Sequence, residues 1–431
     1  MSEDLSSKTT LVYDLGGLFL PVAERLARDF GRVYYHTPWE IGFSKIHAAC
    51  VGEGIEGIER CNDIWTVKNK VDCFVFPDVG TAGLQLELES QGKPVWGSRR
   101  GSRLELDREY FLERLSALGL DVPTYTVCEG MTELAKELKG RKNVYVKISM
   151  FRGMQETKHW RSWKEDNGLL DLWSLRWGPL KEHVPFLVFD AIETEMEIGG
   201  DTYCVDGRWP SLMIHGLEAK DEAYFGAVTP REDMPDELTS ALDAFSEDFA
   251  KVRYRNKFSM EVRVTDTEAF FTDPTCRGGL PSTGTQLEIW SNFSEIVWGG
   301  AHGELVQPEP AAKFSMECAV KQKADRCQWS VVEVPEGLSP WLKLANCCQV
   351  DGITTFPPTD DDDHHIGWLV AQADTPRATL ERMKELAAML PEGTSASVES
   401  LAEVIKEIEV AETDDIPFTN LPLPEPEEVL E

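Results

Sequence analysis

Three oxygen-bearing side chains lie close together in the second half of the sequence. Glu261 falls in one strand-like run, and Asp273 and Thr275 fall in the next. A turn between the runs would bring Glu261 near Asp273, and the two-residue period of a strand puts Thr275 on the same face as Asp273. Mg²⁺ prefers such hard oxygen ligands and usually also binds substrate phosphates. The pattern predicts a magnesium site for phosphoryl transfer, although an acidic pair on a hairpin is more often a solvated surface.

Arg277 follows Thr275 by two residues, and its planar guanidinium could bind a phosphoryl group or a substrate carboxylate. The order and spacing of these four residues resemble the magnesium motif of the ATP-grasp superfamily, in which an acid precedes Glu-x-Asn and then an Arg. Asp273 and Thr275 stand where the family usually has Glu and Asn. The resemblance implies that Glu261, Asp273 and Thr275 bind the metal and that Arg277 is catalytic.

A second resemblance covers residues 92–123. The runs Gly92–Gly97, Leu104–Phe111 and Gly119–Pro123 are similar, in this order, to the passage by which glycinamide ribonucleotide synthetase and related ATP-grasp ligases enter their nucleotide domain. Arg108 occupies the position of a phosphate-contacting lysine, so the resemblance implies that it binds the nucleotide. The helix pattern alone is also typical of an exposed basic residue on an amphipathic helix.

Lys147 lies in the strand-like run Asn143–Ile148. It resembles the lysine of the family's V-V-K strand, which implies contact with the nucleotide phosphates and a catalytic role. The following segment, Ser149–Lys158, takes the place of the family's glycine-rich flap but holds one glycine. Few backbone N–H groups can then approach an anion closely, so Arg152 or Lys158 is expected to supply charge.

The segment Pro185–Glu197 resembles the family's hinge strand, whose backbone meets adenine and whose acid binds the ribose hydroxyls. The resemblance implies Glu195 or Glu197 at the ribose, without deciding between them, and Asp190 near the hinge. Further on, His365–Met383 resembles the ending of the same synthetase. Its Thr375 is expected to cap a helix.

The loop after the first strand departs from the glycinamide ribonucleotide synthetases. These have a G-x-G-G-R-E-H loop that grips a sugar phosphate, whereas Asp14–Leu20 contains no Arg or His. An apolar loop does not offset the desolvation of a phosphate. Phosphoribosylamine is therefore not expected as the substrate.

These residues need a scaffold of several sheets. Strand-like and helix-like runs alternate in the first hundred residues, which predicts a parallel α/β sheet. The expected strands are Thr10–Asp14, Arg32–His36, Cys73–Pro77 and Pro94–Trp96, and the expected helices are Pro21–Phe30 and Ala82–Gln91. A helix is expected over Asp107–Leu118, closed by Gly119. From Pro185 to Gly300 the pattern predicts mostly antiparallel strands with one helix, Glu237–Val252.

The expected fold class is a multidomain α/β and α+β protein, with an ATP-grasp fold preceded by a Rossmann-like parallel sheet. The expected domains are an N-terminal α/β domain (1–104), a first ATP-grasp subdomain with the flap and a tryptophan-rich insertion (105–190), a second with the metal site (191–307), a C-terminal α+β domain (308–411) and an acidic, proline-rich tail (412–431). The tryptophans of the insertion are expected to serve packing or a partner surface.

Composition limits the partners. The 43 Lys and Arg against 75 Asp and Glu give a net charge of −32, which disfavours extended nucleic-acid binding. No run is long and apolar enough for a membrane span, and the first residues lack the order of a signal peptide. The 10 cysteines form no Cys-x-x-Cys pair and suit buried thiols in the cytoplasm.

The leading hypothesis is an ATP-dependent carboxylate–amine ligase that uses ATP with Mg²⁺ or Mn²⁺ and forms an amide through an acyl phosphate. An amino acid such as glycine and a non-phosphorylated amine are the expected small-molecule substrates, and the protein is expected to be a monomer or homodimer. The alternative is a degenerate ATP-grasp protein that binds nucleotide or acts structurally. A dehydrogenase is disfavoured because no G-x-G-x-x-G follows the first strand.

Overall fold

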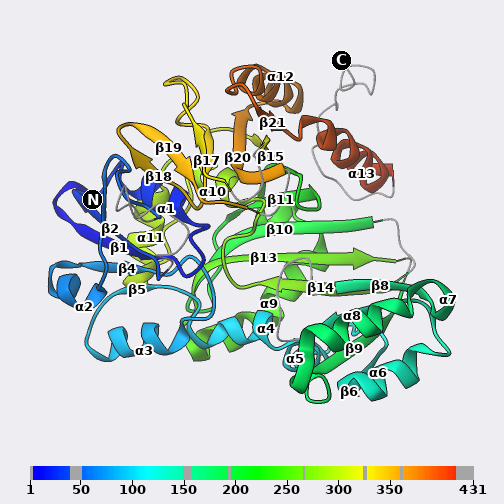
Figure 1. Ribbon diagram of the computed structural model, residues 1–431. Coiled ribbons are helices and arrows are strands. Elements are labelled where there is room, and N and C mark those ends of the chain that lie inside the picture. The colour runs from blue at the N-terminus through cyan, green and yellow to red at the C-terminus, as the bar shows by residue number, and fades with distance from the viewer. Residues whose placement is uncertain are drawn as a thin grey trace. The chain divides into compact units, whose positions relative to one another are not determined.

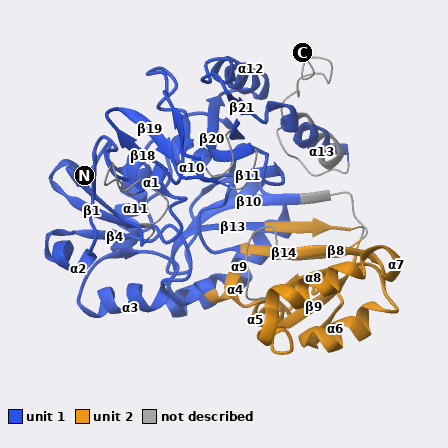
Figure 2. Ribbon diagram, viewed as in Figure 1, with its two compact units in different colours: residues 1–102, 198–260, 275–431 blue, residues 103–197, 261–274 orange. Residues whose placement is uncertain are grey.

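The computed structural model describes residues 3–38, 51–148, 157–192, 196–265, 267–323, 328–359 and 363–413 of the 431-residue chain. Two compact units are distinguished in Figure 2: unit 1 comprises residues 1–102, 198–260 and 275–431, and unit 2 comprises residues 103–197 and 261–274. Unit 2 is therefore built from two segments that are separated in the sequence by part of unit 1.

The N-terminal part of unit 1 is a five-stranded sheet of order β3-β2-β1-β4-β5, in which every neighbouring pair is parallel (Figure 1). Leu11 and Val12 of the central strand are completely buried, as expected for a strand covered on both faces. The predicted parallel sheet is confirmed. Its elements are β1 (Thr9–Tyr13), α1 (Leu20–Leu26), β2 (Arg32–His36), β3 (Ile58–Arg60), α2 (Ile64–Val67), β4 (Cys73–Val75), α3 (Ala82–Ser90) and β5 (Val95–Trp96).

A nine-stranded sheet has the order β14-β13-β10-β11-β12-β15-β20-β17, with β21 beside β15. The pairs from β10 to β17 that follow one another in this order are antiparallel. The strands are β10 (Met196–Val205), β11 (Leu212–Ala219), β12 (Ala223–Pro230), β13 (Arg255–Val264), β14 (Ala269–Thr275), β15 (Phe314–Lys323), β17 (Leu342–Leu344), β20 (Asp363–Ala373) and β21 (Thr394–Ala396). A smaller sheet joins β16 (Ser330–Val332), β19 (Ile353–Phe356) and β18 (Cys348–Val350).

The helices of this part of the chain only partly follow the prediction. The predicted helix over Glu237–Val252 is α9 (Asp236–Val252), and Thr375 caps α12 (Pro376–Ala387) as expected. The prediction of a single helix before Gly300 is wrong, because α10 (Thr283–Ile289) and α11 (Phe293–Ala301) are also present. Nearly every residue of α10 is buried, so it lacks the amphipathic period by which a surface helix is recognised. The last described helix is α13 (Leu401–Thr413).

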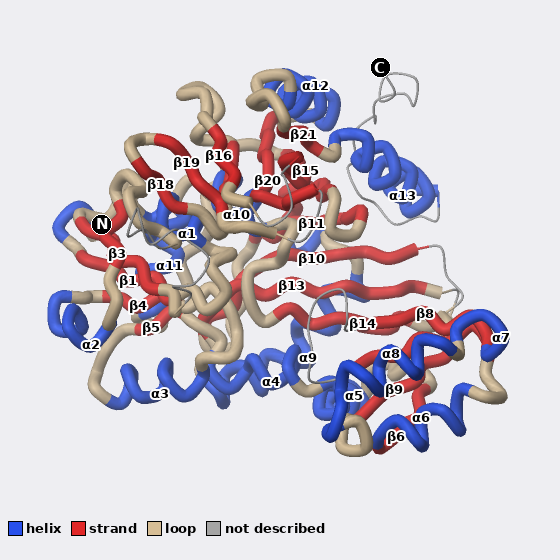
Figure 3. The backbone as a smooth tube through the Cα atoms, viewed as in Figure 1, coloured by secondary structure: helices blue, strands red, loops and turns tan. Residues whose placement is uncertain are grey.

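Unit 2 contains a four-stranded antiparallel sheet of order β6-β9-β7-β8 with helices packed on it (Figure 3). Trp160 and Trp173 are buried in its core, which confirms a packing role for these tryptophans of the insertion. The elements are α4 (Arg103–Leu106), α5 (Arg108–Leu118), β6 (Tyr125–Glu129), α6 (Gly130–Leu138), β7 (Lys142–Ile148), β8 (Thr157–Ser162), α7 (Trp163–Asp166), α8 (Gly168–Trp177) and β9 (Pro185–Asp190).

The eight described cysteines form no disulfide and are all buried, as predicted. Among the described residues, no helix combines the length and apolar character that a membrane span requires.

Candidate functional site

Asp273 of β14 lies between two cationic side chains of unit 2. Its Oδ1 is 3.1 Å from the Arg108 guanidinium, and its Oδ2 is 3.8 Å from Lys147 Nζ. Arg108 also donates a hydrogen bond of 2.9 Å to the carbonyl oxygen of Thr272. The structure thus brings together three residues that the sequence analysis assigned to one site from three separate segments.

Helix α5 holds Arg108 against β14. The Asp107 carboxylate caps the helix by accepting from the Tyr110 N–H at 3.1 Å, and Gly119 closes it in the left-handed conformation. One turn after Arg108, the ring of Phe111 meets Phe271 edge to face, with centroids 5.2 Å apart. Arg108 and Phe111 are three residues apart on α5, and Asp273 and Phe271 are two residues apart on β14. Arg108 therefore meets Asp273 while Phe111 meets Phe271.

The loop after α5 holds the start of β14. The Asp121 carboxylate accepts from the N–H of Ala269 at 3.0 Å, and Asp121 forms a backbone bridge with Phe270. Strand β14 therefore contacts the α5 region on both sides of Phe271, through Asp121 before it and through Arg108 after it. These contacts define the position of the Asp273 backbone relative to Arg108.

Lys147 is placed by the alternation of β7. Val144, Val146 and Ile148 point into the core, which turns Lys147 to the other face, where its side chain is 18% exposed. Strand β7 is an inner strand, with Lys147 opposite Leu187 of β9 and Thr157 of β8. The ammonium group is therefore carried by a strand that is held on both sides.

The other two predicted metal ligands, Glu261 and Thr275, lie on β13 and β14. Glu261 lies on β13, and its carbonyl oxygen accepts a 3.3 Å hydrogen bond from the Thr272 hydroxyl on β14. Thr275 is the last residue of β14, two positions beyond Asp273. Carboxylates such as those of Asp273 and Glu261 have the donor chemistry that Mg²⁺ takes when it also binds phosphate oxygens, so these residue types fit this ion.

Arg277 lies in unit 1, just after β14. Its Nε is 3.8 Å from Asp78 Oδ1, and one terminal nitrogen donates to the carbonyl oxygen of Gly278 at 2.7 Å. The side chain is partly buried. Its predicted catalytic role stays a prediction.

The predicted adenosine-binding residues are described only in part. Asp190 ends β9 with an exposed side chain that pairs with Arg141. Glu197 lies in β10, where only its backbone is described. Arg152 and Glu195 lie outside the described residues.

Unit 1 contains a buried polar network that the sequence analysis did not find. Asp201 of β10 is buried, and its carboxylate accepts hydrogen bonds from Tyr224 (2.5 Å), Ser282 (2.7 Å), Gln286 (3.1 Å) and Ser259. Burial raises the pKa of Asp201, and the hydroxyl donors partly offset this rise. The donors come from three distant segments, so no short motif could reveal the network.

Two further buried charges adjoin this network. Burial lowers the pKa of Lys257 on β13 to about 7, although the charges of Glu317 and Asp201 favour its protonated form. Burial raises the pKa of Glu317 on β15 to about 7, while its Oε2 accepts from the N–H of Thr285 at 2.7 Å. The Lys257 ammonium lies 5.0 Å from the centre of the Phe293 ring. These groups tie α10 and α11 to the sheet.

The loop after β1 is stabilised from within. The Asp14 carboxylate is buried and accepts from the N–H groups of Gly17 (2.9 Å) and Phe19 (2.7 Å) and from the Tyr35 hydroxyl (2.8 Å). Burial raises the pKa of Asp14 to about 6. Leu15 and Leu18 are exposed, so the outer surface of this loop is apolar.

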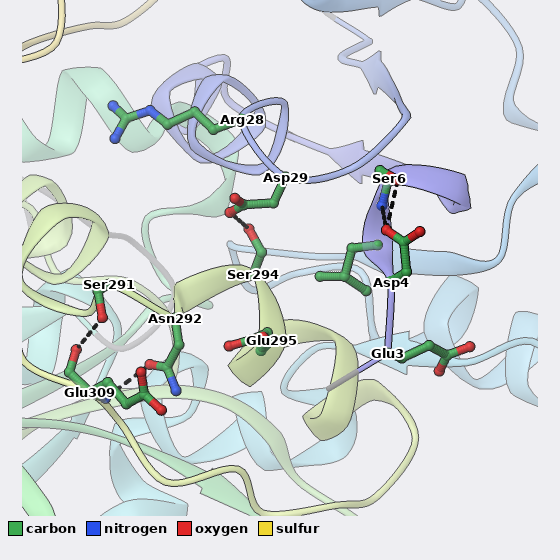
Figure 4. Close-up of a pocket in the computed structure, with 11 residues that line it drawn as sticks. Glu3, Asp4, Ser6, Arg28, Asp29, Ser291, Asn292, Ser294, Glu295 and Glu309 are labelled. Carbon is green, nitrogen blue, oxygen red and sulfur yellow. Dashed lines mark hydrogen bonds between the residues drawn. The ribbon is translucent and has the colours of Figure 1, made fainter. Parts of the chain in front are cut away.

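A surface pocket of about 430 Å³ lies elsewhere in unit 1 (Figure 4). Its lining includes the carboxylates of Glu3, Asp4, Asp29, Glu295 and Glu309. Its one guanidinium, that of Arg28, binds both carboxylate oxygens of Glu288, at 2.7 and 2.8 Å. A lining of this charge does not suit a polyphosphate.

No protein-family model and no curated protein sequence matches the chain. Solved structures do match it over most of its length. Phosphoribosylamine–glycine ligase from Thermotoga maritima aligns with 90% of this chain and 98% of its own, at 15% identity and a TM-score of 0.66.

Two other structures contain nucleotide. The biotin carboxylase domain of 2-oxoglutarate carboxylase from Hydrogenobacter thermophilus, in complex with MgADP, ADP and bicarbonate, covers 98% of both chains at 14% identity and a TM-score of 0.64. N5-carboxyaminoimidazole synthetase from Staphylococcus aureus, complexed with ADP, covers 88% of this chain and 96% of its own at 12% identity and a TM-score of 0.58. The chain therefore has the ATP-grasp fold that these structures share, preceded by a parallel α/β sheet.

Proposed function

We propose that this protein is an ATP-dependent carboxylate–amine ligase. The main support is the meeting of Asp273 and Lys147 in unit 2, with Arg108 against the same carboxylate, because a carboxylate suits a metal ion and a neighbouring ammonium group suits the nucleotide phosphates. The ADP and MgADP in two of the similar structures support the same ligand for this chain.

The proposed reaction has two steps. An oxygen of the substrate carboxylate attacks the γ-phosphorus of ATP and ADP leaves, which gives an acyl phosphate. The nitrogen of an amine then attacks the acyl carbon, phosphate leaves, and the nitrogen loses a proton, which gives an amide. Bound Mg²⁺ would neutralise charge on the phosphates.

The residues of the chain have assigned roles in this proposal. Asp273 and Glu261 hold the metal, with Thr275 as a further oxygen ligand, and Lys147 offsets the phosphate charge in a partly desolvated site. Arg277 is the proposed contact for the reacting phosphoryl or carboxylate group. Positioning and charge neutralisation supply most of the rate enhancement in such phosphoryl transfers.

The nature of the substrates is suggested by the loop after β1. Its carboxylate is engaged within the loop and its exposed side chains are leucines, so it offers no cation to a sugar phosphate. We therefore propose a non-phosphorylated amine and a small carboxylate such as glycine. The buried thiols of the described cysteines, which form no disulfide, suit the cytoplasm as the compartment of this reaction.

Thermal unfolding with ATP and MgCl₂ tests binding, because a ligand of the folded state raises the melting temperature. Release of ADP is then measured with a panel of carboxylates and amines. The proposal requires release that depends on both substrates and is lost in Glu261→Ala. The matched control is Glu268→Ala, which removes an exposed acid from the same hairpin.

The possible results separate a ligase from a nucleotide-binding protein without turnover. Binding of the nucleotide without ADP release across the panel would favour a nucleotide-binding protein without turnover. A melting temperature that ATP and MgCl₂ leave unchanged would contradict both functions.

A further inference from the structure

Arg108 is more enclosed than a direct phosphate ligand needs to be. Its side chain is 5% exposed, compared with 18% for Lys147 and 35% for Asp273. Its guanidinium donates to the Thr272 carbonyl oxygen and contacts Asp273 Oδ1, so two of its nitrogens face consecutive residues of β14. A cation that binds a ligand directly would instead extend its charged group toward solvent.

The location of Arg108 in its helix also indicates that it is not a direct phosphate ligand. Arg108 is the first residue of α5, where the partial positive charge of the helix end disfavours a cation. A buried guanidinium at this point needs compensation, and the Asp273 carboxylate with the Thr272 carbonyl provides it. The pair therefore stabilises the α5–β14 contact before any ligand binds.

The two oxygens of Asp273 have different neighbours. Oδ1 contacts Arg108, and Oδ2 is the oxygen nearer to Lys147. A planar guanidinium that is fixed on a backbone carbonyl and on one carboxylate oxygen limits rotation of the carboxylate. The second oxygen is then directed to the side on which the Lys147 ammonium lies.

We propose that Arg108 is a positioning residue: it orients Asp273 so that one carboxylate oxygen is presented to a divalent cation, and it does not itself bind the nucleotide phosphates. This inference rests on the proposed function. Groups that orient a metal ligand typically change metal affinity about 10- to 100-fold when they are removed. Arg108 therefore governs how much Mg²⁺ the nucleotide complex needs, whereas Lys147 governs affinity for the nucleotide itself.

Calorimetric titration of the full chain with ADP, in EDTA and at a series of MgCl₂ concentrations, tests this distinction. Arg108→Gln is expected to require about 10- to 100-fold more MgCl₂ for the same ADP affinity, while its affinity for ADP in EDTA stays within about threefold of wild type. Lys147→Gln is expected to lose ADP affinity in both conditions. The control Arg103→Gln removes an exposed arginine from the preceding helix and should change neither.

Arg108→Lys provides a second variant with the charge retained. Lysine lacks the planar fork that meets two acceptors at once, so the MgCl₂ requirement should still rise, by less than in Arg108→Gln. In an Asp273→Asn background, Arg108→Gln should have no further effect on the MgCl₂ requirement, since the group that it orients is gone.

The inference would be overturned if either Arg108 variant weakened ADP binding in EDTA as strongly as Lys147→Gln does. It would also be overturned if the effects of Arg108→Gln and Asp273→Asn on the MgCl₂ requirement were additive. Absence of ADP binding by the wild-type chain is a different result, because it would refute the proposed function and the inference together.

Discussion

Tyr224 and Asp201 are joined across an intervening strand. The Tyr224 hydroxyl on β12 lies 2.5 Å from Asp201 Oδ2 on β10, although β11 runs between these two strands. The crossing point is Gly216 of β11, where a Cβ atom would lie 2.1 Å from the Tyr224 oxygen. The absence of a side chain at Gly216 thus allows a buried carboxylate to be reached from two strands away.

We predict that Gly216→Ala destabilises the protein by about 1 to 3 kcal/mol, because the added methyl group displaces a well-packed ring. Urea unfolding measures the change. The control is Gly83→Ala, at a helix position where a Cβ meets nothing within 4 Å and where alanine should be neutral or stabilising. Equal stability of both variants would contradict this account of Gly216.

Tyr224→Phe should reduce the free energy of unfolding by about 1.5 to 3 kcal/mol, the usual range for a hydrogen bond to a charged group. The variant removes one of the four donors that Asp201 receives while keeping the ring. Tyr34→Phe is a matched comparison with a smaller expected loss, since the Tyr34 hydroxyl accepts a 3.3 Å bond from Arg32, whose side chain is 54% exposed. Loss of the same size in both would argue against a special role for the Asp201 network.

Stability should fall on acidification because of His215. Burial lowers the pKa of this histidine on β11 from 6.5 to about 3, so between these values the unfolded chain takes up a proton that the folded chain does not. The free energy of unfolding should therefore drop by about 2 kcal/mol between about pH 7 and about pH 5 from this residue alone.

Comparison of urea unfolding at the two pH values in wild type and His215→Leu isolates this contribution, which the variant should lack. His183→Leu, which replaces an exposed histidine, should retain the full pH dependence. An unchanged pH dependence in His215→Leu would show that His215 titrates normally.

Phe111→Ala should destabilise unit 2 by about 3 to 5 kcal/mol, because it empties the edge-to-face contact with Phe271 in a fully buried place. The variant should also raise the MgCl₂ concentration needed for ADP binding, since Arg108 lies one turn away on the same helix. Leu172→Ala removes a side chain that is 61% exposed and should change stability by less than about 0.5 kcal/mol. Both changes can be followed by thermal unfolding and calorimetry.

Local patterns predicted those elements whose signals are local. The cap at Asp107 and the closing glycine at Gly119 give the bounds of α5, and the alternation of strand-like with helix-like runs predicts the parallel sheet. Helix α10 could not be found in this way, because nearly all of its residues are buried although most of them are polar, so its sequence has no amphipathic period.

The candidate site was also predicted only in part, because some of its contacts are between residues far apart in the sequence. The family resemblance assigned Arg108, Lys147 and Asp273 to one site, and the structure brings them together. The enclosure of Arg108 could not be predicted, because its hydrogen-bond partner on β14 lies 164 residues later in the chain. The Asp201 network depends in the same way on Ser282, which is 81 residues away. Such contacts depend on the tertiary fold and leave no local period.

The division of unit 2 into two segments has a consequence for biosynthesis. Residues 103–197 leave the ribosome well before residues 261–274, so Arg108 and Lys147 are synthesised before Asp273. During this interval Arg108 and Phe111 lack the β14 residues that they contact in the folded chain. A translational pause upstream of β14 would prolong this state.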